Sequence, residues 1–386
     1  MNSGGFMSQE IFRQILMLIF IPCLFVVIAI PMIKKVAEHV GALDIPDARK
    51  VHKAPIPRMG GLGIYFGFLL GYMLFAKPDE IMNSILIGSF IIVLVGIMDD
   101  IKPLKASYKF IGQLMAAAIV VFYGGILLKE ISAFGIYLNF GILSYPITIF
   151  FILGCINCMN LIDGLDGLAG GISAIFCFAI GIIAVAKGQH GLSFILSFIM
   201  LGSCLGFLMH NFHPASIFMG DSGSMFLGFI MAVITLLGYK NVMMSSIIIP
   251  LLILVIPISD TIFAIVRRKL KGESISKPDK MHIHHQLLKR NLGQLGTVLI
   301  IYLATALFAA ASIVYVLVDN EIGYIIYGIL LLILMIFALK TDVIFEHSED
   351  KGNKKKKMEE TKHKELKENS IKTKKNVSKI KEKKGK

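Results

Sequence analysis

Charged side chains are scarce in this sequence. Asp, Glu, Lys and Arg make up 17% of the 386 residues, whereas soluble domains carry about 25%. Tryptophan is absent, hydrophobic residues make up 55% of the chain, and the mean hydropathy is +0.74. This composition excludes a soluble protein of this length and indicates a polytopic membrane protein.

Cysteine is also sparse, and its placement excludes a disulfide framework. The five cysteines all fall in apolar stretches, and their number is odd. Cys155 and Cys158 form a CxxC string, but it lies in a hydrophobic segment with no histidine nearby. We therefore do not interpret it as a redox or zinc site.

Apolar segments long enough to cross a bilayer recur along the chain. A bilayer core requires roughly 20 mostly apolar residues per helix. The sequence therefore predicts an all-α polytopic membrane protein with about 11 transmembrane helices. They are Phe12–Ile33, Leu62–Ala76, Ile81–Met98, Phe110–Leu128, Phe140–Met159, Leu168–Ala186, Leu192–Met209, Met225–Tyr239, Ser246–Val266, Thr297–Val318 and Ile322–Leu339.

Positive charge is concentrated on one side of these spans. Of the 39 Lys and Arg residues, 34 fall in segments 34–61, 99–109, 267–296 and 340–386, and five fall in the connections on the other side. The positive-inside rule then predicts an N-terminus outside and a cytoplasmic C-terminus. We expect a multi-pass protein of the plasma membrane whose charged loops face the cytoplasm.

The chain divides into two parts by composition. Residues 1–340 form the predicted transmembrane domain, and residues 341–386 form a Lys-rich cytoplasmic tail that we expect to be disordered. The net charge of +13 is largely due to this tail. We therefore expect contact with anionic membrane lipids and no nucleic acid partner, with a specific protein partner for the tail as the alternative.

Polar groups gather in the loops on the predicted cytoplasmic side, whereas the outer connections are short and lack them. They are Asp99 and Asp100 after the third span, Asn157, Asn160, Asp163 and Asp166 at the end of the fifth, His210, Asn211, His213, Phe218 and Asp221 after the seventh, and Arg267, Arg268, Asp279, His282, His284 and His285 after the ninth. Taken alone, each set has an ordinary explanation as solvated loop charge or a helix-ending turn. Four such loops on one face favour a shared site.

The residue types at this face are typical of phosphate chemistry. Carboxylate and amide oxygens are the ligands that Mg²⁺ prefers when it also binds substrate phosphates. Arg, Lys and protonated His donate hydrogen bonds to phosphate oxygens. The combination predicts phosphoryl transfer from a cytosolic diphosphate donor to an acceptor in the membrane. Zinc is a poorer match, because the histidines lie among Lys and Arg without Cys or carboxylate at ligand spacing.

Six motifs occur in one order along the chain. They are PRMGGLGI (57–64), GIMDD (96–100), NCMNLIDGLDGLAGG (157–171), FMGDSGS (218–224), PISDT (257–261) and PDKMHIHH (278–285). Together they resemble the polyprenyl-phosphate N-acetylhexosamine-1-phosphate transferase family. The resemblance implies a cytoplasmic cleft in a helical bundle, a UDP-sugar donor, undecaprenyl phosphate as acceptor, release of UMP, and Mg²⁺, with Mn²⁺ as a substitute. It is also compatible with a homodimer.

The resemblance further implies roles for individual residues. The metal ligands are Asp221 and Asn160, and the catalytic residues are Asp99, Asp100, Asp163 and His284. Substrate binding is expected from Lys53, Arg58, Lys109, Asn157, Asp166, Asn211, Phe218, Arg267, His282 and His285. Among these, Asp166, Asn211 and Phe218 are expected to line the uracil pocket, and Lys53, Arg58 and Lys109 to contact phosphate.

The last inner loop favours N-acetylglucosamine as the sugar. The family branch that uses UDP-MurNAc-pentapeptide typically has three adjacent histidines, whereas here Ile283 separates His282 from His284. This version resembles the branch that starts teichoic acid, O-antigen and similar envelope polymers. The peptidoglycan translocase is the alternative within the family. A transporter is a distant alternative, because the spans are nearly free of acids, Asp260 being the main exception.

Overall fold

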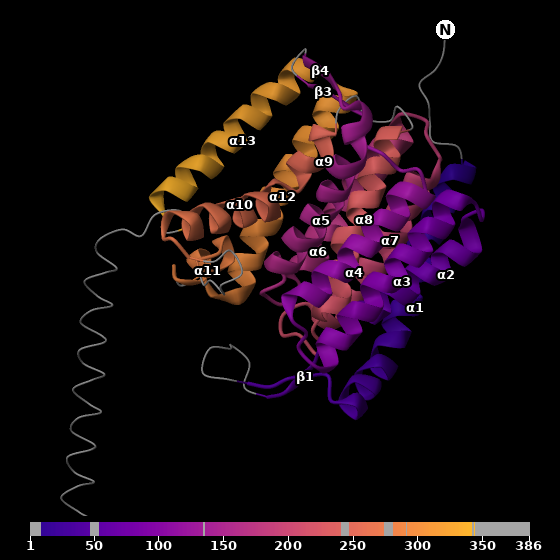
Figure 1. Ribbon diagram of the computed structural model, residues 1–386, viewed down its shortest axis with the longest axis vertical. Coiled ribbons are helices and arrows are strands. Elements are labelled where there is room, and N and C mark those ends of the chain that lie inside the picture. Colours follow the sequence, from indigo (N-terminus) through magenta and orange to yellow (C-terminus); the bar gives the residue numbers. More distant parts are fainter. Residues whose placement is uncertain are drawn as a thin grey trace, which may run out of the picture.

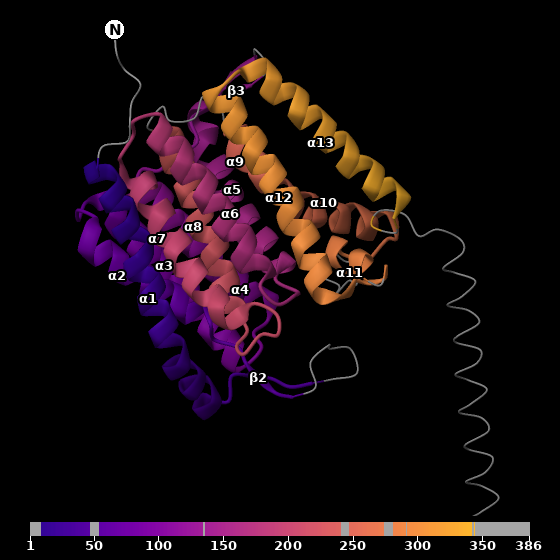
Figure 2. The same ribbon diagram turned by 180° about the vertical axis from the view of Figure 1, so that it is seen from behind.

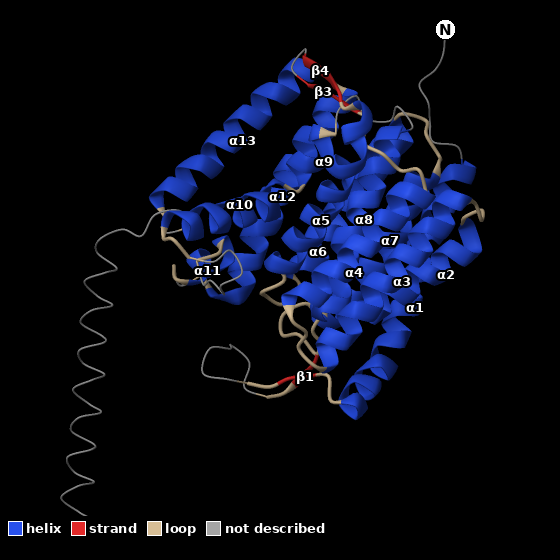
Figure 3. Ribbon diagram, in the orientation of Figure 1, coloured by secondary structure: helices blue, strands red, loops and turns tan. Residues whose placement is uncertain are grey.

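The computed structural model describes residues 9–46, 54–133, 136–240, 247–273, 281–290, 292–341 and 343. Helices dominate these residues (Figures 1 and 3). They are α1 (Gln9–Val40), α2 (Gly61–Phe75), α3 (Glu80–Ile101), α4 (Ala106–Ala118), α5 (Ser144–Ile162), α6 (Leu168–Ala186), α7 (Leu192–Asn211), α8 (Gly220–Lys240), α9 (Ile248–Ile253), α10 (Val255–Leu270), α11 (Ile283–Leu288), α12 (Gly293–Leu317) and α13 (Asn320–Lys340), with a π-helical turn η1 (Ile119–Tyr123) after α4 and a 3₁₀ turn η2 (Gly141–Leu143) before α5.

The strands are short and form two antiparallel hairpins. The first pairs β1 (Leu43–Asp44) with β2 (Ile56–Pro57), and the second pairs β3 (Glu130–Ala133) with β4 (Ile136–Asn139). They lie at opposite ends of the helical bundle, as both views show (Figures 1 and 2). The predicted all-α polytopic architecture is confirmed.

Nine helical segments within the described residues are long and apolar enough to cross a membrane. They correspond to nine of the predicted spans. The second predicted span is α2, a shorter apolar helix of 15 residues. The ninth, Ser246–Val266, is not one helix, because α9 and α10 meet at Leu254.

Proline explains the break between α9 and α10. Pro257 has no N–H, so it cannot bond the carbonyl of Ile253, four residues earlier, where α9 ends. In the first turn of α10 the missing donor costs little, because it has no intrahelical partner there. Figures 1 and 2 show α10 running across the direction of α12.

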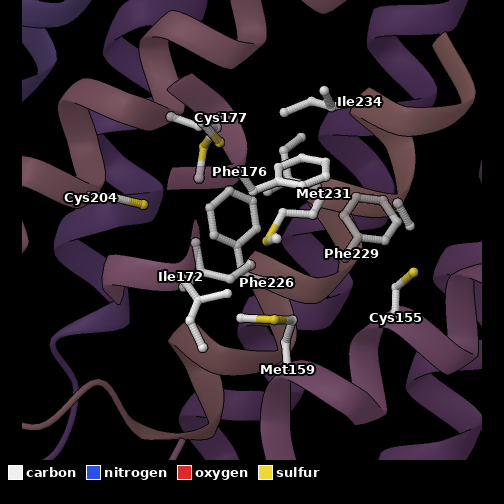
Figure 4. Packing of buried hydrophobic residues seen from close by; sticks show 14 of the residues in the cluster. Cys155, Met159, Ile172, Phe176, Cys177, Cys204, Phe226, Phe229, Met231 and Ile234 are labelled. Carbon is white, nitrogen blue, oxygen red and sulfur yellow. The ribbon is translucent and has the colours of Figure 1, made fainter. Parts of the chain in front are cut away.

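Helix α8 occupies the centre of the bundle. Every residue from Ser222 to Gly238 is buried, as expected for a helix surrounded by others. Phe226 and Phe229 pack among side chains of α5 and α6, including Met159 and Phe176 (Figure 4). This helix carries Asp221 in its first turn, so the core of the bundle positions that carboxylate.

The edges of the bundle are apolar and exposed. In the most apolar stretch of α13 only 17% of the residues are buried, and in that of α1 only 22% are buried. Such outward apolar faces suit helices that contact lipid. Of the predicted tail, only Thr341 and Val343 are described, so its expected disorder lies outside the described residues.

Candidate functional site

A short backbone pairing connects the loop before α2 to the loop before α8. The amide of Phe218 donates to the carbonyl of Pro57 at 2.7 Å, and the amide of Gly60 donates to the carbonyl of Phe218 at 2.9 Å. A Cβ on Gly61 would lie 2.1 Å from Gly223 Cα, so only glycine permits this approach. The pairing carries Arg58 to the start of α8.

Asp221 lies between two cations that come from distant parts of the chain. Arg58 Nη2 is 3.2 Å from Asp221 Oδ1, and Lys109 Nζ is 2.7 Å from Asp221 Oδ2. The Asp221 side chain is 15% exposed, so solvent still reaches it. Both carboxylate oxygens are thus paired with groups that are suited to phosphate binding.

Asp100 holds the N-terminus of α8. Its carboxylate accepts hydrogen bonds from the amides of Asp221 (2.8 Å) and Ser222 (3.2 Å) and from the Ser222 hydroxyl (2.6 Å). Gly220 has a φ of +73°, and a Cβ there would lie 2.5 Å from Asp100 Oδ2. The Asp100 side chain is fully buried, so the structure gives it a capping contact, and its predicted catalytic role remains a prediction.

The neighbouring carboxylate of Asp99 has different partners. It lies 3.4 Å from Lys109 Nζ and accepts from the amide of Leu104 at 2.8 Å. Its side chain is 9% exposed. Asp99 is therefore a nearly buried carboxylate that is paired with the Lys109 ammonium and does not line the cavity.

A cavity of about 710 Å³ opens beside this cluster, a size typical of small-molecule sites. The sequence predicted ten substrate-binding residues, four catalytic residues and two metal ligands. Those that line the cavity are Arg58, Asn160, Asp163, Asp166, Asn211, Phe218, Asp221 and His285.

Asp163 ends α5 at the cavity wall. Loss of solvation, together with the negative charges of Asp221, Asp100 and Asp166, raises the pKa of Asp163 to about 7, against the opposing effect of Arg58. A carboxyl group with this pKa exchanges a proton near neutral pH, as a general base or acid does.

Another part of the cavity wall is held by Asp166, in the loop after α5, and by Asn211, the last residue of α7. Asp166 Oδ2 is 2.8 Å from His213 Nδ1 and accepts from the amide of Ala215 at 3.1 Å. Asn211 joins the same loops, since its Oδ1 accepts from Gly167 N at 2.9 Å and its Nδ2 donates to Ile217 O at 2.8 Å. These contacts fix the wall around Phe218.

The histidine loop contributes one of its predicted histidines to the cavity wall. His285 lines the cavity, whereas His284 is 2% exposed and its Nε2 lies against Gly164. Burial, and then the charge of His285, lowers the pKa of His284 to about 3, so this ring is neutral at physiological pH. His282 is also buried and bonds Asp260.

Two more predicted residues lie away from the cavity wall, and a third cannot be compared with it. Arg267 is 2% exposed and donates to the carbonyl of Val343, so it faces the end of α13 rather than the cavity. Asn157 donates to Gln113 Oε1 at 2.9 Å from an exposed position on α5 and is absent from the cavity wall. Lys53 lies outside the described residues.

Sequence patterns missed some residues of the site. Asp44 lines the cavity and lies 4.0 Å from Arg58 Nη1, but it belongs to no motif and reaches the site through the β1–β2 hairpin. Ser224 accepts from Asn160 Nδ2 at 2.8 Å, and its place in the FMGDSGS string was the available signal. Gln294, at the start of α12, also lines the cavity.

The donor set suits a hard cation bound together with phosphate. Asp221 and Asn160 both line the cavity, and their side chains carry oxygen atoms of the kind that Mg²⁺ prefers. Within the described residues, no group of three or more His, Cys, Asp or Glu is arranged to hold a metal by itself. Mg²⁺ does not require one, because it usually takes one or two carboxylates with substrate phosphates and water.

Comparisons with known proteins identify the family. Residues 82–239 match the model of glycosyl transferase family 4. The chain is 41% identical over 347 residues to a probable undecaprenyl-phosphate N-acetylglucosaminyl 1-phosphate transferase of Bacillus subtilis, covering 88% of this chain and 96% of that protein. It is 32% identical to a decaprenyl-phosphate N-acetylglucosaminephosphotransferase of Mycolicibacterium smegmatis, over 73% and 78% of the two chains.

A further relative is the undecaprenyl-phosphate alpha-N-acetylglucosaminyl 1-phosphate transferase of Escherichia coli O157:H7, which is 30% identical over 72% of this chain and 78% of that protein. These matches extend over most of the transmembrane domain. The chain therefore belongs to glycosyl transferase family 4, among the polyprenyl-phosphate N-acetylglucosamine-1-phosphate transferases.

Proposed function

We propose that this protein transfers N-acetylglucosamine 1-phosphate from UDP-N-acetylglucosamine to undecaprenyl phosphate and releases UMP. The product, undecaprenyl-diphosphate-N-acetylglucosamine, would begin a cell-envelope polymer such as teichoic acid. The observation that carries the proposal is the pairing of Asp221 with Arg58 and Lys109 beside the cavity. The names of the relatives support the sugar and the lipid.

The reaction forms one P–O bond and breaks another. An oxygen of the lipid phosphate attacks the β-phosphorus of the donor, and the bridging oxygen leaves with UMP. Arg58 and Lys109 stabilise negative charge on the transferring phosphoryl group, since both are held beside the cavity wall. Asp99, next to Lys109, positions the incoming lipid phosphate.

Mg²⁺ would be held by Asp221 and Asn160, where it would neutralise phosphate charge. To bind there, Asp221 must exchange at least part of its pairing with Arg58 and Lys109 for the cation, which frees these side chains for the phosphates. Phe218 stacks on the uracil, and Asp166 and Asn211 hold the surrounding loops.

We place this site at the cytoplasmic face of the plasma membrane. The support is the distribution of Lys and Arg, 34 of 39 in segments on one side of the predicted spans. A UDP-sugar donor is a cytosolic metabolite, and the acceptor is a membrane lipid, so this location gives both substrates access.

Donor specificity tests the proposal. The purified full-length protein is incubated with undecaprenyl phosphate, Mg²⁺ and one UDP-sugar at a time, and UMP release is followed. UDP-N-acetylglucosamine should give UMP only when the lipid is present, and Asp221→Asn should lower the rate of release at least about a hundredfold. UMP release from UDP-MurNAc-pentapeptide instead would assign the protein to peptidoglycan synthesis.

A further inference from the structure

Asp260 is a buried acid that the proposed reaction does not use. It lies on α10 with 2% of its surface exposed. A carboxylate in a predicted membrane span is costly to bury and requires a partner. Its partners therefore indicate why it is present.

Both oxygens of Asp260 bind the histidine loop. Oδ2 is 2.9 Å from His282 Nδ1, and Oδ1 accepts from the amide of Ile283 at 2.7 Å. Because an ionised carboxylate only accepts, His282 Nδ1 carries the donated hydrogen. This pair of contacts fixes both the ring of His282 and the first turn of α11.

The histidines that follow connect this anchor to the cavity. The rings of His282 and His284 are parallel within 4°, with centroids 5.7 Å apart, and those of His284 and His285 are 4.3 Å apart. His284 packs against Gly164, and His285 reaches the cavity wall. The line of contacts runs from Asp260 to the donor site through rings that are packed on one another.

Two other roles for Asp260 have less support. A metal site would require further ligands, and the described residues contain no group of three or more suitable side chains. An ion pathway would require an available carboxylate, whereas both oxygens here are bound to one loop.

We propose that Asp260 is a positioning residue for the sugar-nucleotide donor, acting through His282 to hold α11 and thereby His285 at the cavity wall. The inference rests on the proposed function, since it assumes that the cavity binds the donor. Neither Asp260 nor His282 lines the cavity. Loss of the contact between Asp260 and His282 should therefore shift His285 at the cavity wall without removing any group that binds phosphate.

A double-mutant cycle tests this dependence. Asp260→Asn, His282→Gln and the double variant are compared with the wild type in the UMP-release assay, varying donor and lipid acceptor separately. Each single change should lower kcat/KM for the donor by about tenfold to a hundredfold, the factor associated with hydrogen bonds to a charged group. The double variant should lose little more than either single variant, while KM for the lipid stays unchanged.

Ser259→Ala is the matched control, because Ser259 is also buried on α10 but bonds only Ile256 of its own helix. It should retain wild-type kinetics. If Asp260→Asn cannot be purified in a folded state, Asp260→Glu, which keeps the charge, replaces it in the cycle.

Additive losses in the double variant, or equal increases in KM for donor and lipid, would overturn the positioning role. An unchanged donor KM and kcat in Asp260→Asn would do the same. Failure of the proposed function is a separate result, since the wild type itself would then release no UMP.

Discussion

The carboxylate of Asp100 accepts a hydrogen bond of 2.8 Å from the backbone amide of Asp221. One aspartate thus fixes the position of another, 121 residues away, at the first turn of the central helix. The adjacent Asp99 faces Lys109 instead. Two consecutive carboxylates therefore have distinct surroundings. Substituting each one separately should show their different roles.

Asp100→Ala should destabilise the protein more than Asp99→Ala, because Asp100 accepts three hydrogen bonds at the start of α8, whereas Asp99 accepts one from Leu104. Each buried donor that is left without an acceptor costs about 1–3 kcal/mol. Thermal unfolding of the detergent-purified variants measures the difference. Equal melting temperatures for the two variants would contradict the capping role of Asp100.

Asp221→Asn should reduce turnover by at least about a hundredfold, because a preorganised cation site contributes several kcal/mol to phosphoryl transfer. Insertion and thermal stability should change little, since the side chain is partly solvated. Excess EDTA on the wild type should have the same effect, reversed by Mg²⁺. Wild-type turnover under either condition would remove the metal from the mechanism.

The stability of the apoprotein should depend on Asp163 and on pH. Because the pKa of Asp163 is raised to about 7, the folded protein keeps its proton up to that pH, whereas the unfolded chain releases it near pH 4. The free energy of unfolding therefore falls as the pH rises through this range.

Asp163→Asn lacks the contribution of Asp163 to this dependence. In EDTA, its melting temperature relative to wild type should be higher at pH 8 than at pH 5. A constant difference between the two proteins at both values would show that Asp163 titrates normally.

Phe218→Ala should weaken all uridine donors by a similar factor, about tenfold, through loss of stacking. His285→Ala and Gln294→Ala should instead change the preference between UDP-N-acetylglucosamine and other UDP-sugars, because a polar wall rejects sugars that leave its groups unpaired. Both residues line the cavity. Steady-state kinetics with three UDP-sugars compares the variants, and a change of preference in Phe218→Ala alone would reverse the assignment.

The orientation of the chain can be tested on intact cells. Lys105→Cys lies in the loop before α4, one helical turn before Lys109, and Lys187→Cys lies in an exposed loop after α6. A membrane-impermeant thiol reagent should label the second variant and leave the first unlabelled until the cells are opened. Labelling of Lys105→Cys from outside would place the active site on the other face.

Much of the fold was predictable because its signals are local. A run of about 20 apolar residues forms a helix in a bilayer whatever lies beyond it, since its backbone must bond internally. The exception was Ser246–Val266, where Pro257 divides the span into α9 and α10. A mean hydropathy is taken over the whole segment, so it does not reveal that one proline lacks a backbone N–H.

The candidate site was predictable as a set of loops but not as a set of contacts. Arg58, Lys109 and Asp221 were expected near phosphate and the metal, and the structure brings all three together. Arg267 and His284 were expected beside substrate, yet both are buried and neither lines the cavity. In the sequence, His284 and His285 differ by one position, and only the packing of α11 distinguishes them.

The sequence by itself determined that this is a helical membrane protein with one polar face and a phosphate-type chemistry, because composition and charge act over short stretches of chain. Tertiary structure decided which carboxylate caps α8, which histidine reaches the cavity, and that Asp44 joins Arg58. These choices depend on contacts between residues far apart in the chain. Such partners are selected by packing around α8, which no local pattern encodes.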